Sequence, residues 1–166
     1  MELVWATPDF TILGQADPGF PILLWPSMES CVPANRFMRA YLQRGAIRSK
    51  RSWPSVGRAM YDFFSFLEAH ELHWDHVRGS EESGLVAAYR DYCLDQIGLD
   101  RNTVRQRLIY VCKFYEYALS QQWIDRLPFG SEDRTARRKD AFLAHVDASG
   151  GKASARDVMK KKRRDW

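Results

Sequence analysis

Apolar residues recur at three- and four-residue intervals between residues 100 and 123, and this is the clearest pattern in the chain. Val104, Leu108 and Val111 fall on one face of a helix with this spacing. Asp100 precedes the pattern and can cap the helix through its carboxylate. The opposite face and its flanks carry Asn102, Arg105, Gln106, Arg107, Tyr110, Lys113 and Tyr117. The sequence therefore predicts a helix with one buried face and one basic, polar face.

Three further segments have helical patterns: residues 33–44, 53–70 and 81–97. Ser52 is the expected N-cap of the second of these helices, and Ser80 that of the third. In the second helix the buried positions are expected at Val56, Ala59, Met60, Phe63, Phe64, Phe66 and Leu67. Its polar positions, which include Arg58, point away from them, so this helix follows the same plan as residues 100–123.

The two ends of the chain differ from this helical middle. Residues 1–29 hold short apolar runs at 10–13 and 20–25, which fit two strands around a turn but also fit an irregular arm. Residues 131–166 are rich in charge, contain the stretch Ser149-Gly150-Gly151 and are typical of a basic linker. The predicted organisation is therefore an N-terminal arm (1–29), an all-α domain (30–130) and a linker (131–166).

Basic residues are unevenly distributed, although the net charge is only +4 over 166 residues. They gather at 48–51, 101–113, 134–139 and 160–164. Such clusters favour a polyanionic partner, but a solvated helix face or a basic tail gives the same pattern. The hydrophobic content of 45% indicates a folded chain with a real core.

The cysteines and the first residues bear on the compartment. Cys31, Cys93 and Cys112 are odd in number and lack the short spacing of metal sites, which favours a reduced, cytoplasmic protein. The first ten residues lack the basic and apolar segments of a secretory signal. No apolar run is long enough to span a bilayer, so no membrane partner is expected.

Three histidines, at 70, 73 and 76, lie beside Glu71 and Asp75 and raise the question of a metal site. Zinc sites usually draw ligands from more than one element, and Trp74 looks like a packing residue of a turn. The sequence favours a connector over a metal site, and we expect neither a metal nor a cofactor.

Two segments together resemble the N-terminal core-binding, SAM-like domain of tyrosine recombinases, the phage-integrase type. The first is SWPSVGRAMYDFFSFL at residues 52–67, and the second is GLDRNTVRQRLIYVCKFYEYA at residues 98–118, followed by Pro128-Phe129. Their order and their separation by a third helix carry the resemblance, which covers residues 33–130. Leu127 stands where the family commonly has an asparagine.

The resemblance implies a small orthogonal bundle of four or five helices that binds double-stranded DNA, with the second and fourth helices facing the major groove. It also implies self-association with other recombinase protomers on DNA. The family's strand-breaking chemistry resides in a separate domain with a His-x-x-Arg pair and a tyrosine nucleophile. None of the four histidines here is followed three residues later by arginine. We therefore assign no catalytic residue and expect this chain not to be an enzyme.

The expected function is site-specific DNA binding for DNA integration and recombination. Arginines and lysines would mainly contact phosphates, and side-chain amides are better suited to base edges. The candidate DNA-binding residues are Arg48, Lys50, Arg51, Ser52, Arg58, Arg101, Asn102, Thr103, Arg105, Gln106, Arg107, Tyr110 and Lys113. Two alternatives stay open: a stand-alone DNA-binding regulator and a helical protein-interaction module. Salt-dependent duplex binding separates the second from the DNA readings, and a downstream His-x-x-Arg and tyrosine would separate the first from a recombinase.

Overall fold

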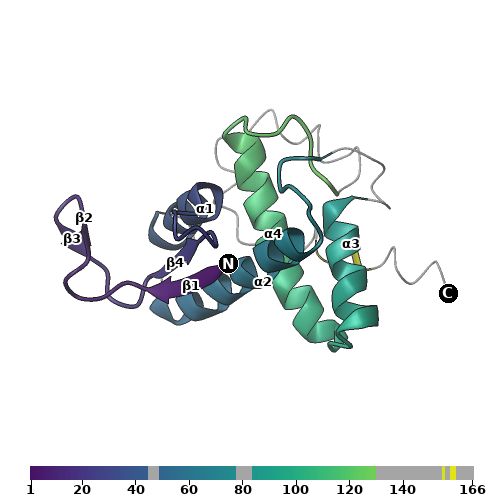
Figure 1. Ribbon diagram of the computed structural model, residues 1–166, viewed down its shortest axis with the longest axis horizontal. Coiled ribbons are helices and arrows are strands. Elements are labelled where there is room, and N and C mark those ends of the chain that lie inside the picture. The colour runs from purple at the N-terminus through teal and green to yellow at the C-terminus, as the bar shows by residue number, and fades with distance from the viewer. Residues whose placement is uncertain (45–48, 78–83, 130–154, 156–157, 160–166) are drawn as a thin grey trace. The chain divides into compact units, whose positions relative to one another are not determined.

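The structure, a computed structural model, describes residues 1–44, 49–77, 84–129, 155 and 158–159. The chain divides into two compact units, Met1–Ala69 and His70–Trp166. It is mostly helical, with two small two-stranded sheets near the N-terminus (Figure 1). The predicted helical class and N-terminal hairpin are therefore both present. The division after Ala69 falls inside the range 30–130, which the sequence analysis treats as one domain.

The N-terminal hairpin is longer than the apolar runs predict. Leu13 and Gly14 form the tip, both with positive φ (52° and 79°), as the primed turns of two-residue hairpins require. The apolar run 20–25 does supply a strand, but it pairs with the first residues of the chain rather than with residues 10–13. The strands are β1 (Glu2–Trp5), β2 (Thr11–Ile12), β3 (Gln15–Ala16) and β4 (Pro21–Leu24), paired β1 with β4 and β2 with β3, all antiparallel. The outer part of the hairpin, with β2 and β3, extends well beyond the pair of β1 and β4 (Figure 1).

Helix α1 (Val32–Gln43) holds the hairpin in its unit, and Asn35 makes the more buried of its side-chain contacts to it. The amide of Asn35 accepts from the backbone N–H of Leu23 and donates to the carbonyl of Leu23, both at 2.8 Å. Leu23 is fully buried, so both of its polar main-chain groups need partners. The residues predicted as an arm are thus part of the hydrogen-bonded core of this unit.

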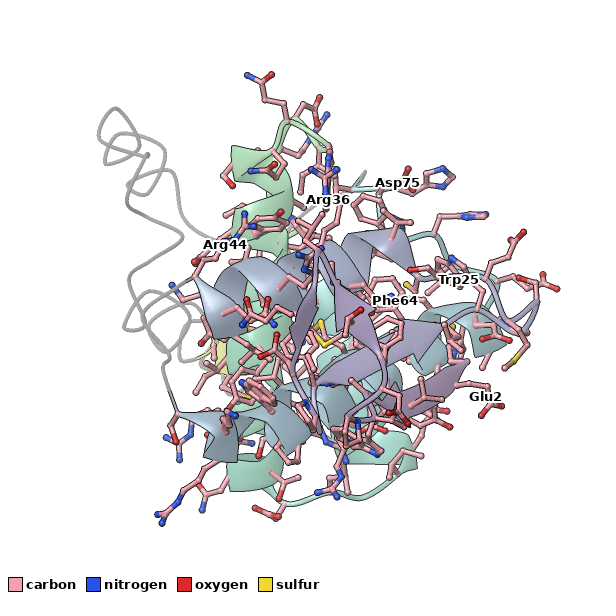
Figure 2. The ribbon with its side chains drawn as sticks, turned by 90° about the vertical axis from the view of Figure 1, so that its left-hand side faces the viewer. Glu2, Trp25, Arg36, Arg44, Phe64 and Asp75 are labelled. Atoms are coloured by element: carbon pink, nitrogen blue, oxygen red, sulfur yellow. The ribbon has the colours of Figure 1, made fainter. Side chains whose placement is uncertain are left out.

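Helix α2 (Trp53–Ala69) packs against the same sheet. All seven predicted core positions of α2 are buried, whereas Arg58 is exposed. Phe64 contacts the ring of Trp25 edge to face at 5.9 Å, next to the end of β4 (Figure 2). Gly57 faces Pro21 so closely that a Cβ at position 57 would lie 2.6 Å from the Cβ of Pro21. The absent side chain of Gly57 therefore sets the distance between helix and strand.

The start of α2 differs from the expected Ser52 cap. A 3₁₀ turn, Lys50–Ser52, leads directly into the helix, and Ser49 caps this turn by accepting from the N–H of Arg51. Ser52 is therefore the last residue of the turn rather than the capping residue. The prediction missed this because a 3₁₀ turn supplies the first carbonyls and moves the cap three residues back.

The second unit contains α3 (Leu85–Asp91) and α4 (Arg101–Ser120). The predicted helix 81–97 starts later within the described residues and continues as a π-helical turn, Tyr92–Gln96. Gly98, with φ of 75°, ends it as expected. The expected Ser80 cap lies outside the described residues.

Two connectors close around the C-terminal half of α4. The ring of Trp74, which precedes α3, contacts Phe114 at 5.7 Å, and Trp123, which follows α4, contacts Tyr117 at 5.4 Å. Tyr115 donates a hydrogen bond from its hydroxyl to the carbonyl of Trp74 at 2.8 Å. Aromatic side chains from both connectors thus enclose this half of the helix.

A short C-terminal stretch packs into the second unit. Ala155, Val158 and Met159 are buried, and Arg90 of α3 donates to the carbonyl of Val158 at 2.8 Å. The basic clusters 134–139 and 160–164 and most of the predicted linker lie outside the described residues. Among the helices that the structure describes, none has the length and apolar character needed to cross a membrane.

Candidate nucleic-acid interface

The N-terminus of α4 is built by the predicted cap. Asp100 Oδ1 accepts from the N–H groups of Asn102 (2.9 Å) and Thr103 (3.1 Å), and Asp100 Oδ2 accepts from the hydroxyl of Thr103. The hydrogen bonds from the Thr103 side chain and backbone lower the pKa of Asp100 below its ordinary value. The carboxylate is therefore ionised near neutral pH and satisfies the free N–H groups at this helix end.

The first turns of α4 expose basic and amide side chains together. Arg105 donates from Nη2 to Oδ1 of Asn102, so the guanidinium and the amide are held side by side. Gln106 donates from Nε2 to the hydroxyl of Tyr110 at 3.0 Å. From Arg101 to Tyr115 the helix carries no acidic residue. We call the exposed residues of this surface the α4 cluster: Arg101, Asn102, Arg105 and Gln106.

Arg107 and Thr103 are half-buried beside the α4 cluster. The hydroxyl of Thr103 donates to the capping carboxylate of Asp100, so it stabilises the helix end and is not a free donor for a ligand. Arg107 and Thr103 therefore lie at the edge of the exposed surface.

The prediction of an exposed face is wrong for the second half of α4. Tyr110 and Lys113 are only 8% and 2% exposed, and Tyr117 is also buried. Trp74 contacts Phe114 and Trp123 contacts Tyr117 in this part of the helix. Tyr110 and Lys113 therefore do not belong to the surface that a nucleic acid could reach in this structure.

Lys113 has a structural partner instead. Its Nζ lies 3.3 Å from Oε2 of Glu116, one turn further along α4. A buried ammonium group is costly unless it is paired, and Glu116 supplies the opposite charge.

A second basic surface lies in the other unit, at the start of α2. Lys50 and Arg51 are exposed, and Lys50 Nζ lies 5.4 Å from the centre of the Trp53 ring, within cation–π range. Arg58 is exposed on α2 itself, seven residues after Arg51. We call Lys50, Arg51, Ser52 and Arg58 the α2 cluster. The remaining candidate, Arg48, lies outside the described residues.

The structure thus groups eight of the candidate residues into two clusters, one in each compact unit. Sequence reasoning missed a third group of polar residues, Arg36, Arg39 and Gln43, on α1 beside the hairpin. Their spacing of three and four residues placed them on one helix face, which was the available signal. Their relation to the hairpin was not visible, because it depends on pairing between distant segments.

The histidine segment forms no metal site among the residues that the structure describes. The rings of His73 and His76 lie with centroids 4.7 Å apart, and His70 contacts Tyr92 edge to face. All three cysteines are buried and none forms a disulfide. Burial raises the pKa of the Cys31 thiol to about 12, so this cysteine stays a neutral core residue.

Comparison with protein-family models, with curated proteins and with solved structures found no match for this chain.

Proposed function

We propose that this protein binds double-stranded DNA as the core-binding part of a tyrosine recombinase. The observation that carries the proposal is the α4 cluster: two exposed arginines and two amides on consecutive turns of one helix. The one acidic residue beside them, Asp100, is committed to the helix cap. A positive surface with amide groups fits phosphates and base edges together.

The two kinds of side chain have different tasks in this proposal. Arg101 and Arg105 contact phosphates, release counterions and make binding depend on salt. Gln106 and Asn102 reach base edges, where an amide can pair with adenine. The bond from Arg105 to Asn102 orients both groups before DNA arrives, which reduces the entropy lost on binding.

The α2 cluster supplies a second set of phosphate contacts. Lys50, Arg51 and Arg58 are exposed at the start of their helix, as the family resemblance requires of the second helix. We further propose the family's orthogonal bundle of helices, self-association of protomers on DNA and a cytoplasmic location. Catalysis in integration and recombination is assigned to a separate domain, not to residues of this chain.

The test compares the double variant Arg101→Ala/Arg105→Ala with the wild type. Fluorescence anisotropy measures their binding to a DNA duplex across a range of salt concentrations. Loss of two phosphate contacts should weaken binding and reduce the slope of log K against log salt by about 1.8. Arg126→Ala is the matched control, because Arg126 is exposed in the same unit but lies outside the α4 cluster. This control should bind like the wild type.

Circular dichroism establishes that the variants remain helical. Unchanged affinity and salt slope in the folded double variant would refute DNA binding through α4. The control removes one charge and the double variant removes two, so equal weakening per charge removed would show that total charge, rather than the α4 cluster, governs the interaction.

A further inference from the structure

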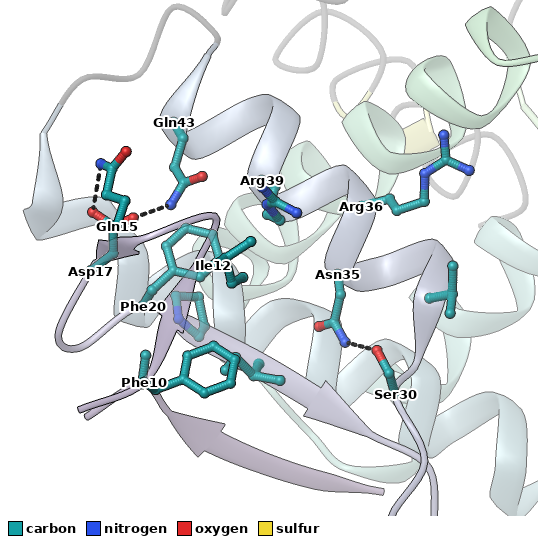
Figure 3. Close-up of a pocket in the computed structure, with 14 residues that line it drawn as sticks. Phe10, Ile12, Gln15, Asp17, Phe20, Ser30, Asn35, Arg36, Arg39 and Gln43 are labelled. Atoms are coloured by element: carbon teal, nitrogen blue, oxygen red, sulfur yellow. Dashed lines mark hydrogen bonds between the residues drawn. The ribbon is translucent and has the colours of Figure 1, made fainter. Parts of the chain in front are cut away.

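A cavity of about 260 Å³ lies in the first unit between the hairpin and α1 (Figure 3). The side chains of Phe10, Ile12 and Phe20 form its apolar side, next to the outer part of the hairpin. Phe10 is 45% exposed and Ile12 is 37% exposed, so both present apolar surface beside the cavity. Sites for drug-sized ligands measure roughly 300–1,000 Å³, so this cavity suits a smaller molecule.

The charge of the cavity comes from α1. Arg39 lines the side of the cavity that α1 forms, and it is half-buried (Figure 3). It has no hydrogen-bond or ion-pair partner among the described residues. Arg36 also lines the cavity. A guanidinium group that is partly removed from water gains most from a carboxylate, with which it can form two parallel hydrogen bonds.

The lining contains one acidic residue, and it does not neutralise Arg39. Asp17 accepts from Gln43 Nε2 at 2.9 Å and from Gln15 Nε2 at 3.4 Å, at the end of the cavity near the hairpin turn (Figure 3). The carboxylate of Asp17 is therefore already held by two amides, whereas the guanidinium group of Arg39 has no such partner among the described residues. The cavity thus offers one unpaired positive charge beside an apolar surface.

We propose that this cavity binds a small carboxylic acid with an apolar body. The carboxylate pairs with Arg39, and the apolar body covers Phe10, Ile12 and Phe20. This combination of one charged contact and an apolar lining is the usual composition of a small-ligand site. The site is independent of DNA binding, since its residues belong to neither the α4 cluster nor the α2 cluster.

The test is an NMR titration of the ¹⁵N-labelled full chain with 3-phenylpropionate, with 3-phenylpropionamide as the neutral comparison. The acid should shift the amide signals of the hairpin and of α1 at concentrations up to about 10 mM, the range in which small ligands bind. The amide should bind about tenfold more weakly, because it lacks the charge that pairs with Arg39.

Arg39→Gln should weaken binding of the acid by about tenfold and leave binding of the amide unchanged. Arg44→Gln is the matched control, because Arg44 is exposed on the segment that follows α1 and does not line the cavity. The wild-type comparison of acid with amide needs no variant, so it holds even if Arg39→Gln folds poorly. Absence of shifts, shifts elsewhere in the chain, or equal binding of acid and amide would overturn the proposal.

Discussion

Helices α2 and α4 have similar sequence patterns but different surroundings. In α2, the polar residue Arg58 is exposed and the expected apolar face is buried. In α4, the first turns follow the same rule, but Tyr110 and Lys113 on the polar face are buried as well. A helical wheel assumes that one side of a helix faces water, and this assumption fails where connectors enclose the helix. The free-energy cost of burying the charged group is then offset by a specific ion pair, here Lys113 with Glu116.

The two units also expose different chemistry. Of the nine large apolar side chains that are exposed among the described residues, seven lie in Met1–Ala69. Both buried cationic side chains of the described residues, Arg90 and Lys113, lie in His70–Trp166. The first unit therefore offers apolar surface to a ligand, whereas the second uses internal charges to hold its own segments.

The largest expected effect comes from the buried face of α4. Leu108 is fully buried, so Leu108→Ala should lower the free energy of unfolding by about 2–5 kcal/mol through lost burial and the cavity left behind. Chemical denaturation measures this value. Arg101→Ala on the exposed side of the same helix is the control and should change stability by less than about 0.5 kcal/mol. A near-zero cost for Leu108→Ala would mean that the two faces of α4 are assigned backwards.

The charged pair inside α4 gives the next effect. Glu116→Gln removes the carboxylate beside buried Lys113 and should cost about 2 kcal/mol, less than for a fully enclosed pair because the Glu116 side chain is 17% exposed. Adding Lys113→Met should recover most of this loss, since the buried charge is then gone. Denaturation of the single and double variants gives the coupling. A Glu116→Gln protein as stable as the wild type would show that Lys113 reaches water, as the wheel predicted.

Gly57 tests the contact between α2 and the sheet. Alanine normally favours a helix over glycine, but the new Cβ would lie 2.6 Å from Pro21 Cβ. Gly57→Ala should therefore destabilise the protein by about 1–2 kcal/mol through overpacking. Ser55→Ala, at an exposed position of the same helix, is the control in thermal unfolding. A gain in stability for Gly57→Ala would show that α2 and β4 can separate freely.

Tyr115 gives the smallest effect near neutral pH. Tyr115→Phe removes the bond to the Trp74 carbonyl and should cost about 1 kcal/mol. Burial, followed by the charges of Asp75 and Cys112, raises the pKa of Tyr115 well above its ordinary value. The unfolded chain therefore loses this proton first, and stability falls as pH rises above about 10.

Stability measured from neutral to alkaline pH checks the titration. Tyr115→Phe should flatten the alkaline decline, whereas Tyr61→Phe on α2, where the tyrosine is half-buried, should leave it as in the wild type. An unchanged decline in Tyr115→Phe would assign the titration to other groups.

Local signals in the sequence predict the helices well. Asp100 caps α4 as expected because a cap depends only on residues two or three positions away. Gly98 ends the preceding helix for a similarly local reason. The strands of the hairpin were harder to predict from the sequence. The residues of β1 have no distinctive hydrophobic pattern, and the strand is defined by its pairing with β4.

The candidate site could be predicted only where it depends on local signals, and not where it depends on contacts between distant segments. The exposure of Arg105 and Gln106 follows from the helix period alone. The burial of Lys113 depends on tertiary packing around the helix, and no periodicity within α4 contains that information. The cavity beside Arg39 was missed because it requires both the hairpin and α1.

The hydrogen bond from Arg90 to the carbonyl of Val158 has a consequence for synthesis on the ribosome. It joins residues 68 positions apart, so the burial of Arg90 cannot be completed until residue 158 has left the exit tunnel. The first unit has a bond of similar span, from the amino group of Met1 to Oε2 of Glu68, but this bond closes within Met1–Ala69 and does not wait for residue 158. The first unit can therefore fold during translation, while the second unit must wait for its last described residues.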